Sequence, residues 1–576
     1  MYSPCHQLQT DVLVIGAGGA GCQAAMVASD LGATVTLIDK GRLGLSGATY
    51  DAFTWGKGIT VAVSGFNMTD DPEDHCQKAM EAARGLANPA LARLVAYEAP
   101  QRFRELLEVG FPFRANRLGA CFGKGLIGAV IDQPDLAQSF RREIARRPIR
   151  LLERTMALRL LGDGRRCIGA GALQPDGEIL AISAAATILA TGGASSMFRY
   201  NFAGPELTGD GHVLALEAGA ALANLEFYQA ILGTTGPVSL FFPQWFLAGK
   251  PRLTTVEGHD FLANYLPVGA DPGGLLYERS LHGPFTSSLP SGQVDLAITS
   301  EIMAGRGTAP PGDRERLAGV WCDFAGLPDG VRRELDGRFG RPALAWLRSK
   351  GMDLEAGPVA IAPFAHAFNG GIVIDEHGRT AVPGLYACGE VAAGPHGANR
   401  VGGHMLSVLL VFGARAGRHA AESAASAPRA APDGESVASA GRLVAALNQQ
   451  VNAAGPSAVR RAVQEALSPA MIAKDEVSLG TALAELERIG GSSRPSDGAV
   501  SPTETAAALG VANLRQMAEL VVRSAQLRRE SRGPHYRTDF PKEEESFGNR
   551  SLVWERKEGV LVAHWASLAE KGQMRA

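Results

Sequence analysis

The sequence predicts an α/β fold, α+β overall, in which a two-part Rossmann-like nucleotide-binding domain carries an inserted domain and precedes a helical domain. Three observations lead to this prediction. A glycine-rich turn joins two apolar runs within residues 11–39, another apolar run at 384–392 ends in a second glycine motif, and a proline-bearing stretch at 424–440 precedes a region of helical periodicity. Short apolar runs bounded by turn residues are typical of buried parallel strands.

The glycine-rich turn is the strongest motif of the chain. Residues 11–15 (DVLVI) form an apolar run, and GAGGAG follows with Gly16, Gly18 and Gly21 in the spacing G-x-G-x-x-G. A helical pattern and a second apolar run then lead to Asp39, 23 residues after Gly16. Strand, glycine turn, helix, strand and acid in this order form the fingerprint of a dinucleotide site. The glycines admit a pyrophosphate at a helix N-terminus, and the acid accepts hydrogen bonds from a ribose.

Composition excludes several classes of function. The charged fraction of 20% and the apolar fraction of 46% are typical of a globular protein, and 576 residues are enough for several domains. The net charge of −3 gives no reason to expect nucleic acid or an acidic membrane as a partner. The uncharged segment 227–249 contains two prolines and three glycines, so we expect buried loop and strand there, and no direct membrane insertion.

The seven cysteines are scattered, at positions 5, 22, 76, 121, 167, 322 and 388. None forms a C-x-x-C pair, which argues against an iron–sulfur cluster or a zinc site within this chain, and we predict no metal ligands. Unclustered cysteines are typical of a reducing compartment. The first residues, MYSPCHQLQTDV, lack the basic and apolar regions of a signal peptide, and we therefore expect a cytoplasmic protein.

Two later strands indicate how the nucleotide domain is divided. Residues 149–191 alternate in short runs broken by GDG and PDGE, and they lead into AAATILATGG at 184–193. Far downstream, GLYACGEVA at 384–392 closes with Gly389 and Glu390. In flavoproteins of this fold both strands end at the cofactor, so the long segment between them implies an inserted substrate domain.

On these residues the chain resembles the flavoprotein subunit of fumarate reductase and succinate dehydrogenase, together with L-aspartate oxidase. The resemblance covers nearly the whole chain, and its most specific motifs are GLYACGEVAAGPHGANRVGG (384–403), VFGARAG (411–417) and ESRGPHYRTDFP (530–541). Segment 236–258 is less typical and looks closer to the capping region of the adenylylsulfate reductase branch. The resemblance implies an FAD domain, an inserted capping domain and a C-terminal helical domain.

The expected boundaries follow from these motifs and from local composition. Residues 424–440 (SAASAPRAAPDGESVAS) look like a linker, 441–530 show helical periods without a strand signal, and the tail ends in an alternating VWERKEGVLVAHW. We expect the first part of the FAD domain at 1–233, the capping domain at 234–356, the second part of the FAD domain at 357–424, the linker at 425–440, and the C-terminal helical domain and tail at 441–576.

The resemblance also assigns roles to individual residues. Arg400, in PHGANR, would clamp a substrate carboxylate with its planar guanidinium, and His366, in AHAFNGG, would contact the substrate. His404 is a third catalytic candidate, at the start of a helix whose N-terminus would face the flavin, where the family has an asparagine–serine pair in place of His404 and Met405. The expected cofactor-binding residues are Gly16, Gly18, Gly19, Gly21, Asp39, Lys40, Ser46, Gly47, Ala190, Thr191, Gly192, Asp210, Gly389, Glu390, Arg400, Gly403, Met405 and Leu406.

The chain departs from the family pattern where the family binds and protonates its substrate. The histidine of EF-x-Q-x-H-P-T is lost to Ala230 and Ile231, and the proton-donating arginine aligns with Ser291, ten residues before Glu301. Either the ungapped alignment is shifted here or the usual proton relay is missing, in which case we expect negligible fumarate reduction. Gly47 lies near the histidine that binds flavin covalently in some members, so we expect noncovalent FAD. Candidate replacements for the arginine are His366, His404, Tyr228, His259, Arg252 and Asp295.

The sequence therefore predicts an FAD-dependent oxidoreductase that acts on a small anionic substrate. The leading hypothesis is two-electron redox at a carbon–carbon bond next to a carboxylate, with hydride passing to or from flavin N5. The alternatives are adenylylsulfate-reductase-like chemistry at sulfur, aspartate-oxidase-like amine oxidation, and a flavoprotein subunit that only transfers electrons. Because relatives mostly pass electrons to a separate protein, we expect an iron–sulfur subunit or a ferredoxin-like carrier as partner.

Overall fold

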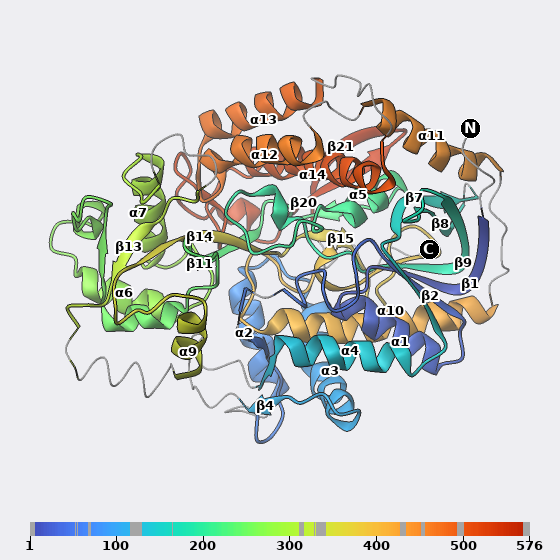
Figure 1. Cartoon of the computed structure of the whole chain (residues 1–576), viewed down its shortest axis with the longest axis horizontal. Helices are drawn as coiled ribbons and strands as arrows, with labels where there is room; N and C mark the ends of the chain where they lie inside the picture. Colours follow the sequence, from blue (N-terminus) through green and yellow to red (C-terminus); the bar gives the residue numbers. More distant parts are fainter. Residues whose placement is uncertain are drawn as a thin grey trace.

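The computed structural model describes residues 6–567 except 52, 55, 67–70, 116–128, 164, 310–315, 328, 330–340, 427–433, 451–454 and 492–499. The nucleotide-binding sheet lies at one side of the molecule, a smaller sheet with its helices at the opposite side, and most of the C-terminal helices run along the top of the view (Figure 1). Among the described helices, none is both long and apolar enough to cross a membrane.

The nucleotide-binding sheet combines strands that are far apart in sequence: β1 (His6–Ile15), β2 (Val35–Asp39), β6 (Ile149–Glu153), β7 (Met156–Gly162), β8 (Cys167–Leu173), β9 (Ile179–Leu189) and β16 (Leu385–Ala387). Their order is β6-β2-β1-β9-β8-β7, and β16 pairs in parallel with the end of β9. The strands expected within 11–39 and 149–191 are confirmed, and β1 begins before the expected run. Pairing of β16 with β9 confirms that the chain returns to this sheet after the inserted segment.

Helices cover the sheet and bring both ends of the nucleotide domain together: α1 (Gly19–Asp30), α2 (Pro72–Ala83), α3 (Pro89–Glu108), α4 (Gln133–Ala145) and α10 (His404–Ser426). α1 and α10 pack closely, and a Cβ atom on Gly417 would lie 2.4 Å from the carbonyl oxygen of Ala24. This close approach fixes the start of α10 beside the glycine turn. A small sheet of β3 (Gly56–Ile59), β4 (Arg114–Ala115) and β5 (Ala129–Asp132) lies next to it.

The inserted segment forms its own sheet, in the order β11 (Tyr228–Thr234), β14 (Val359–Phe368), β13 (Val320–Asp323) and β12 (Arg252–Thr254), with α6 (Pro272–Ser280), α7 (Gly292–Met303) and α9 (Arg341–Ser349). Its core is aromatic and includes Phe242, Trp245 and Phe246. Segment 227–249 is largely buried strand and loop, as predicted, but Pro237 and Val238 are exposed and Gln244–Gly249 forms a short 3-10 helix. β11 crosses the expected boundary at 233, and β14 begins just after the one at 357, so this sheet joins the capping region to the FAD domain.

The C-terminal region is mainly helical, with α11 (Gly434–Gln450), α12 (Gly455–Leu467), α13 (Glu476–Gly491) and α14 (Pro502–Leu527). α11 begins inside the stretch that composition assigned to a linker, because its alanines and leucines pack against β7. The alternating tail forms the hairpin of β20 (Ser551–Lys557) and β21 (Val560–Ala566), and such alternation is typical of strands. Short elements from several parts of the chain complete the fold: α5 (Asp210–Glu217), β10 (Leu222–Ala223), β15 (Gly371–Val373), β17 (Ala392–Ala393), β18 (Ala473–Lys474) and β19 (Tyr536–Arg537).

A buried ion network attaches the tail to the rest of the molecule. Arg528 donates to Glu226 at 2.5 Å and to Glu530 at 2.8 Å, and Arg532 also donates to Glu530. All four side chains are almost fully buried. Buried charges of this kind are tolerated only when they are paired, so the ESRGPHYRTDFP motif has a structural role in this chain.

Candidate functional site

The glycine turn forms an open cradle between β1 and α1. Gly16 has φ of +107°, a conformation that favours glycine, and Gly18 is extended with φ of −67° and ψ of 177°. A Cβ atom on Gly18 would meet nothing closer than Oγ1 of Thr49 at 3.7 Å. The space beside Gly18 is therefore open to a pyrophosphate, while the amide of Gly19, the first of α1, donates to Oγ1 of Thr49 at 3.1 Å.

Polar side chains beyond the turn are held by one another. Asp39 accepts from the backbone amide of Ala17 at 2.7 Å and from Oγ of Ser46 at 3.0 Å. Lys40 donates to Oδ2 of Asp210 at 2.5 Å. The positive charge of Lys40 is thus already paired with a protein carboxylate. Lys40 is therefore better suited to hydrogen-bond a nucleotide than to bind a further negative charge.

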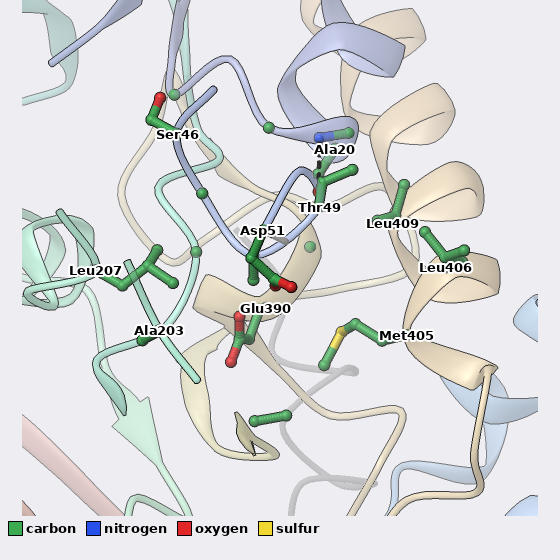
Figure 2. A pocket seen from close by; sticks show the side chains of 18 of the residues that line it. Ala20, Ser46, Thr49, Asp51, Ala203, Leu207, Glu390, Met405, Leu406 and Leu409 are labelled. Carbon is green, nitrogen blue, oxygen red and sulfur yellow. Dashed lines mark hydrogen bonds between the residues drawn. The ribbon is translucent and has the colours of Figure 1, made fainter. Parts of the chain in front are cut away.

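One cavity contains almost the whole expected cofactor site (Figure 2). Of the eighteen residues predicted to bind the cofactor, all but Gly21 line it. A Cβ atom on Gly21 would lie 1.8 Å from the carbonyl oxygen of Gly16, so this glycine serves the packing of α1 on β1. Thr191 lines the cavity with a buried hydroxyl that has no hydrogen-bond partner. An open cradle and an unsatisfied hydroxyl in one cavity fit a dinucleotide cofactor.

Arg400 presents a buried charge to the same cavity. Its side chain is 7% exposed, and Nε donates to Oε1 of Gln229 at 2.9 Å. Among the described residues no carboxylate lies within 4.0 Å of its guanidinium nitrogens. Burial lowers the pKa of Arg400 to about 10, against the opposing attraction of Glu390. A buried guanidinium of this kind has the charge and geometry to bind an anion.

Gln229 fixes the direction of this guanidinium. Its amide nitrogen donates to Oδ1 of Asn399 at 2.6 Å and to the carbonyl oxygen of Arg400 at 3.0 Å, while its amide oxygen accepts from Arg400. The side chain is fully buried on β11. Sequence reasoning did not assign Gln229 a role, although it lies in the EF-x-Q motif.

His366 reaches the cavity because β14 is irregular at this point. Ala365 pairs with Ala230 and Ala367 pairs with Gln229, so His366 is the extra residue of a bulge. Bulges redirect side chains and are common next to active sites. Burial, together with the positive charges of Arg400 and Lys57, lowers the pKa of His366 to about 3. His366 is therefore a neutral hydrogen-bonding group near neutral pH.

Two further charged residues, Lys57 and Asp51, line the part of the cavity that also contains Arg400, His366 and Glu390, and the sequence analysis missed both. We call this part the reaction end of the cavity. Nζ of Lys57, on β3, lies 2.8 Å from Oδ1 of Asp51. Figure 2 shows the carboxylates of Asp51 and Glu390 with the thioether of Met405 around one space. Burial raises the pKa of both carboxyl groups, and Lys57 opposes the rise at Asp51. The only signal in sequence was a lysine between two glycines, in GKG at 56–58.

The capping side of the cavity is apolar. Phe202, Ile231, Phe241, Trp245 and Pro284 line it, and all but Pro284 belong to the aromatic core of the inserted sheet. Two backbone hydrogen bonds hold this side of the cavity in place. Phe241 donates to the carbonyl oxygen of Phe53 at 2.9 Å, and Phe285 donates to that of Ala230 at 2.7 Å.

Ser291, which aligns with the family's proton-donating arginine, does not reach the cavity. It is fully buried before α7, and its hydroxyl lies 2.9 Å from Nε2 of His282. Asp295, one turn further on, is fully buried in an ion pair with Nε of Arg279 at 2.5 Å. Neither residue is placed to exchange a proton with a substrate.

Among the other suggested replacements, His366 lines the cavity. Tyr228 faces away from it and donates to the carbonyl oxygen of Met471 at 2.6 Å. His404 is buried behind the cavity lining, with its ring centroid 5.5 Å from that of His396. His259 and Arg252 are exposed on the capping region.

Comparison with known families agrees with this geometry. The profile described as "FAD binding domain" matches residues 11–406, and the profile described as "Fumarate reductase flavoprotein C-term" matches residues 460–567. The chain belongs to the FAD-dependent oxidoreductase family of fumarate reductase flavoproteins and L-aspartate oxidases. The predicted FAD cofactor and the two-part FAD domain with a C-terminal domain are thereby confirmed.

Members of this family are similar to the chain over nearly its full length. A subunit of the CoM/CoB fumarate reductase of Methanothermobacter marburgensis is 32% identical over 579 residues, covering 95% of this chain and 97% of that protein. L-aspartate oxidase of Bacillus subtilis is 29% identical over 563 residues, covering 95% and 94%. The structure of E. coli quinol fumarate reductase FrdA has the same fold, with a TM-score of 0.81 at 22% identity, covering 98% of this chain and 97% of that one.

Proposed function

We propose that this FAD-dependent oxidoreductase carries out two-electron redox on a small carboxylate, at a carbon–carbon bond next to the carboxyl group. The observation that carries the proposal is Arg400, a buried guanidinium without a carboxylate partner in the cavity that also contains the dinucleotide cradle. Bound FAD supplies or accepts a hydride at N5. The chain supplies the anion site and the proton chemistry around it.

Arg400, His366 and Lys57 divide this work. Arg400 binds the carboxylate with the guanidinium face that Gln229 leaves free, and neutral His366 donates a hydrogen bond to the same end of the substrate. Lys57 holds the proton that is exchanged with the carbon next to the carboxylate. It is the cavity-lining ammonium at the reaction end, and Asp51 holds it in place.

Amine oxidation is the second candidate, and the similarity to L-aspartate oxidases favours it. It needs the same carboxylate clamp, with an amino group next to the reacting carbon. Anaerobic bleaching of the flavin by amino acids, with release of ammonia, would identify it. Bleaching by sulfite with AMP would instead identify chemistry at sulfur, and a flavin that no small molecule bleaches would identify an electron-transfer subunit.

We also propose that the electrons pass to or from a separate carrier with an iron–sulfur centre. The methanogen relative is named as one subunit of a fumarate reductase, and so as one part of an assembly. The cysteines of this chain include no C-x-x-C pair to hold a cluster of its own. If air reoxidises the substrate-reduced chain at the full catalytic rate, no such partner is needed.

The charge-conserving variant Arg400→Lys tests the proposed function. Lysine is a point charge and cannot reproduce the bidentate guanidinium fork, so kcat/KM for the carboxylate should fall by about 10–100-fold, since a charge-assisted hydrogen bond contributes about 1.5–3 kcal/mol. FAD content should stay the same. Arg415→Lys is the matched control. Arg415 lies on α10 outside the cavity lining, and its Nε donates to Oε2 of Glu98 at 2.9 Å. Wild-type turnover in Arg400→Lys would refute the clamp.

A further inference from the structure

Among the described residues, four charged side chains lie at the reaction end of the cavity. Two cations, Arg400 and Lys57, face two carboxylates, Asp51 and Glu390, and His366 is neutral near neutral pH. Lys57 is committed to Asp51 at 2.8 Å. Arg400 is therefore the cation that remains for an anionic group of the substrate.

The rest of the substrate meets an apolar surface. β11 carries both Gln229, which holds Arg400, and Ile231, two residues further along the same face of the strand. Phe241 and Trp245 extend this surface, and Pro284 approaches it through the backbone hydrogen bond of Phe285. None of the side chains that form this surface carries a charge, and the indole N–H of Trp245 is its one hydrogen-bond donor.

A dicarboxylate would therefore place one charge among aromatic and aliphatic side chains. Desolvation of an unpaired carboxylate is costly, and the nearby Asp51 and Glu390 would add repulsion. An apolar substituent at the same place would gain from burial against these side chains. The cavity thus discriminates by charge at one end and by hydrophobicity at the other.

We propose that the substrate is a monocarboxylate with an apolar substituent, namely a 2-enoate or its saturated counterpart, and not a dicarboxylate. This inference rests on the proposed function. In the reductive direction the π bond between C2 and C3 breaks, C3 receives a hydride from the reduced cofactor, and C2 receives a proton. The cofactor loses two electrons, and an external low-potential electron carrier restores them.

Binding to the oxidised, FAD-loaded full chain tests the proposal without turnover. Crotonate, trans-cinnamate, fumarate and succinate would be titrated by calorimetry and by the change in flavin absorbance. We expect crotonate or cinnamate to bind at least tenfold more tightly than fumarate. Binding of fumarate as tight as that of both monocarboxylates would overturn the proposal.

Two variants sharpen the test. Trp245→Leu should change the affinity for cinnamate at least fivefold and leave that for fumarate unchanged, whereas Phe246→Leu, at the next residue and outside the cavity lining, should change neither. Ile231→Lys should improve fumarate binding at least tenfold and weaken crotonate binding. Equal effects of Trp245→Leu and Phe246→Leu on cinnamate would contradict the apolar surface, even if Ile231→Lys fails to fold.

Failure of this inference can be told apart from failure of the proposed function. If fumarate binds as tightly as crotonate and Arg400→Lys weakens both, the carboxylate clamp stands and the monocarboxylate proposal is wrong. If no carboxylate perturbs the flavin and Arg400→Lys changes nothing, the proposed function itself is wrong.

Discussion

The nucleotide cradle and the reaction end of the cavity are built in different ways. The cradle is made largely from backbone and from neighbouring residues, with Gly16, Gly18 and Asp39 close together in sequence. The reaction end is assembled from side chains on separate strands and loops, with Lys57 and Arg400 more than three hundred residues apart. The residues that form the cradle lie in one contiguous motif, whereas the charged side chains of the reaction end come together only after the chain has folded.

This difference also separates what each region recognises. The cradle can bind any pyrophosphate of the right shape, because amides and a helix dipole do not distinguish substrates. The reaction end selects through Arg400, which has no carboxylate within 4.0 Å among the described residues, and through an apolar surface. Variants in each region should therefore separate cofactor binding from substrate chemistry.

The largest expected effect is loss of the cofactor from Gly18→Val. The backbone at Gly18 is compatible with any residue and a Cβ atom would meet nothing within 3.7 Å, so the chain should fold while the side chain occupies the place of the pyrophosphate. We expect FAD content to fall more than tenfold, with near-normal secondary structure by circular dichroism.

Gly21→Ala is the contrasting variant within the same motif. Its Cβ atom would lie 1.8 Å from the carbonyl oxygen of Gly16, so the protein itself should be destabilised, by about 3 kcal/mol or more. Denaturant unfolding measures the difference between the two variants. A Gly18→Val protein that keeps its FAD would contradict the assignment of the cradle.

Lys57→Met should give the next largest effect, at the reaction end. Methionine keeps the length of the side chain but carries no proton, and general acid–base catalysis contributes about 10²–10⁴-fold to rate. We expect kcat to fall within this range while Kd for the carboxylate changes little, because Arg400 remains. Equal loss of kcat in the control Lys78→Met, at a half-buried lysine paired with Asp74, or none in Lys57→Met, would remove Lys57 from the mechanism.

Gln229→Glu should act through Arg400. A carboxylate at the position of Oε1, 2.9 Å from Nε, would balance the guanidinium charge that we assign to the substrate. Gln229→Met loses the same amide donors without adding charge and is the matched control. We expect KM to rise roughly tenfold more in Gln229→Glu than in Gln229→Met, because a charge-assisted hydrogen bond contributes about 1.5–3 kcal/mol. Equal KM values would show that Gln229 has only a structural role.

The last expected effect concerns stability and not turnover, and it is a loss of stability in mild acid. Burial lowers the pKa of His282, His366 and His404 to about 3 in the folded state, whereas the unfolded chain binds these protons near pH 6.5. The unfolded state therefore gains protons first, and stability should fall as the pH drops from 6.5 towards 3. Each such histidine contributes up to about 1.4 kcal/mol per pH unit.

Denaturant unfolding at pH 7 and pH 5 measures this effect. His404→Gln should flatten the dependence on pH, and His259→Gln, at an exposed position, should leave it unchanged. A dependence that is the same in both variants would mean that His404 is protonated in the folded protein.

Sequence predicted the nucleotide domain well because its determinants are local. The strand, turn, helix, strand and acid of residues 11–39 need no long-range information, and the second motif at 384–392 matched the end of β16. The linker was misjudged in part, since alanine-rich composition serves equally for a linker and for α11.

The reaction end was predicted only where a motif marked it. Arg400 and His366 came from motifs, but the bulge that turns His366 into the cavity cannot be read from a strand pattern. Lys57, Asp51 and Gln229 were missed because each acquires its role only in the folded chain. Lys57 and Asp51 pair with each other in the cavity lining, and Gln229 contacts Arg400, which is distant in sequence. Only tertiary structure shows that Ser291 faces His282 and not the cavity.

The most direct test of the central claim is a crystal structure of the FAD-loaded protein with crotonate bound. We predict one carboxylate oxygen within about 2.7–3.1 Å of a guanidinium nitrogen of Arg400, with the methyl group against Ile231, Phe241 or Trp245. A crotonate carboxylate held elsewhere, with the guanidinium of Arg400 paired to a carboxylate of the protein, would contradict the account.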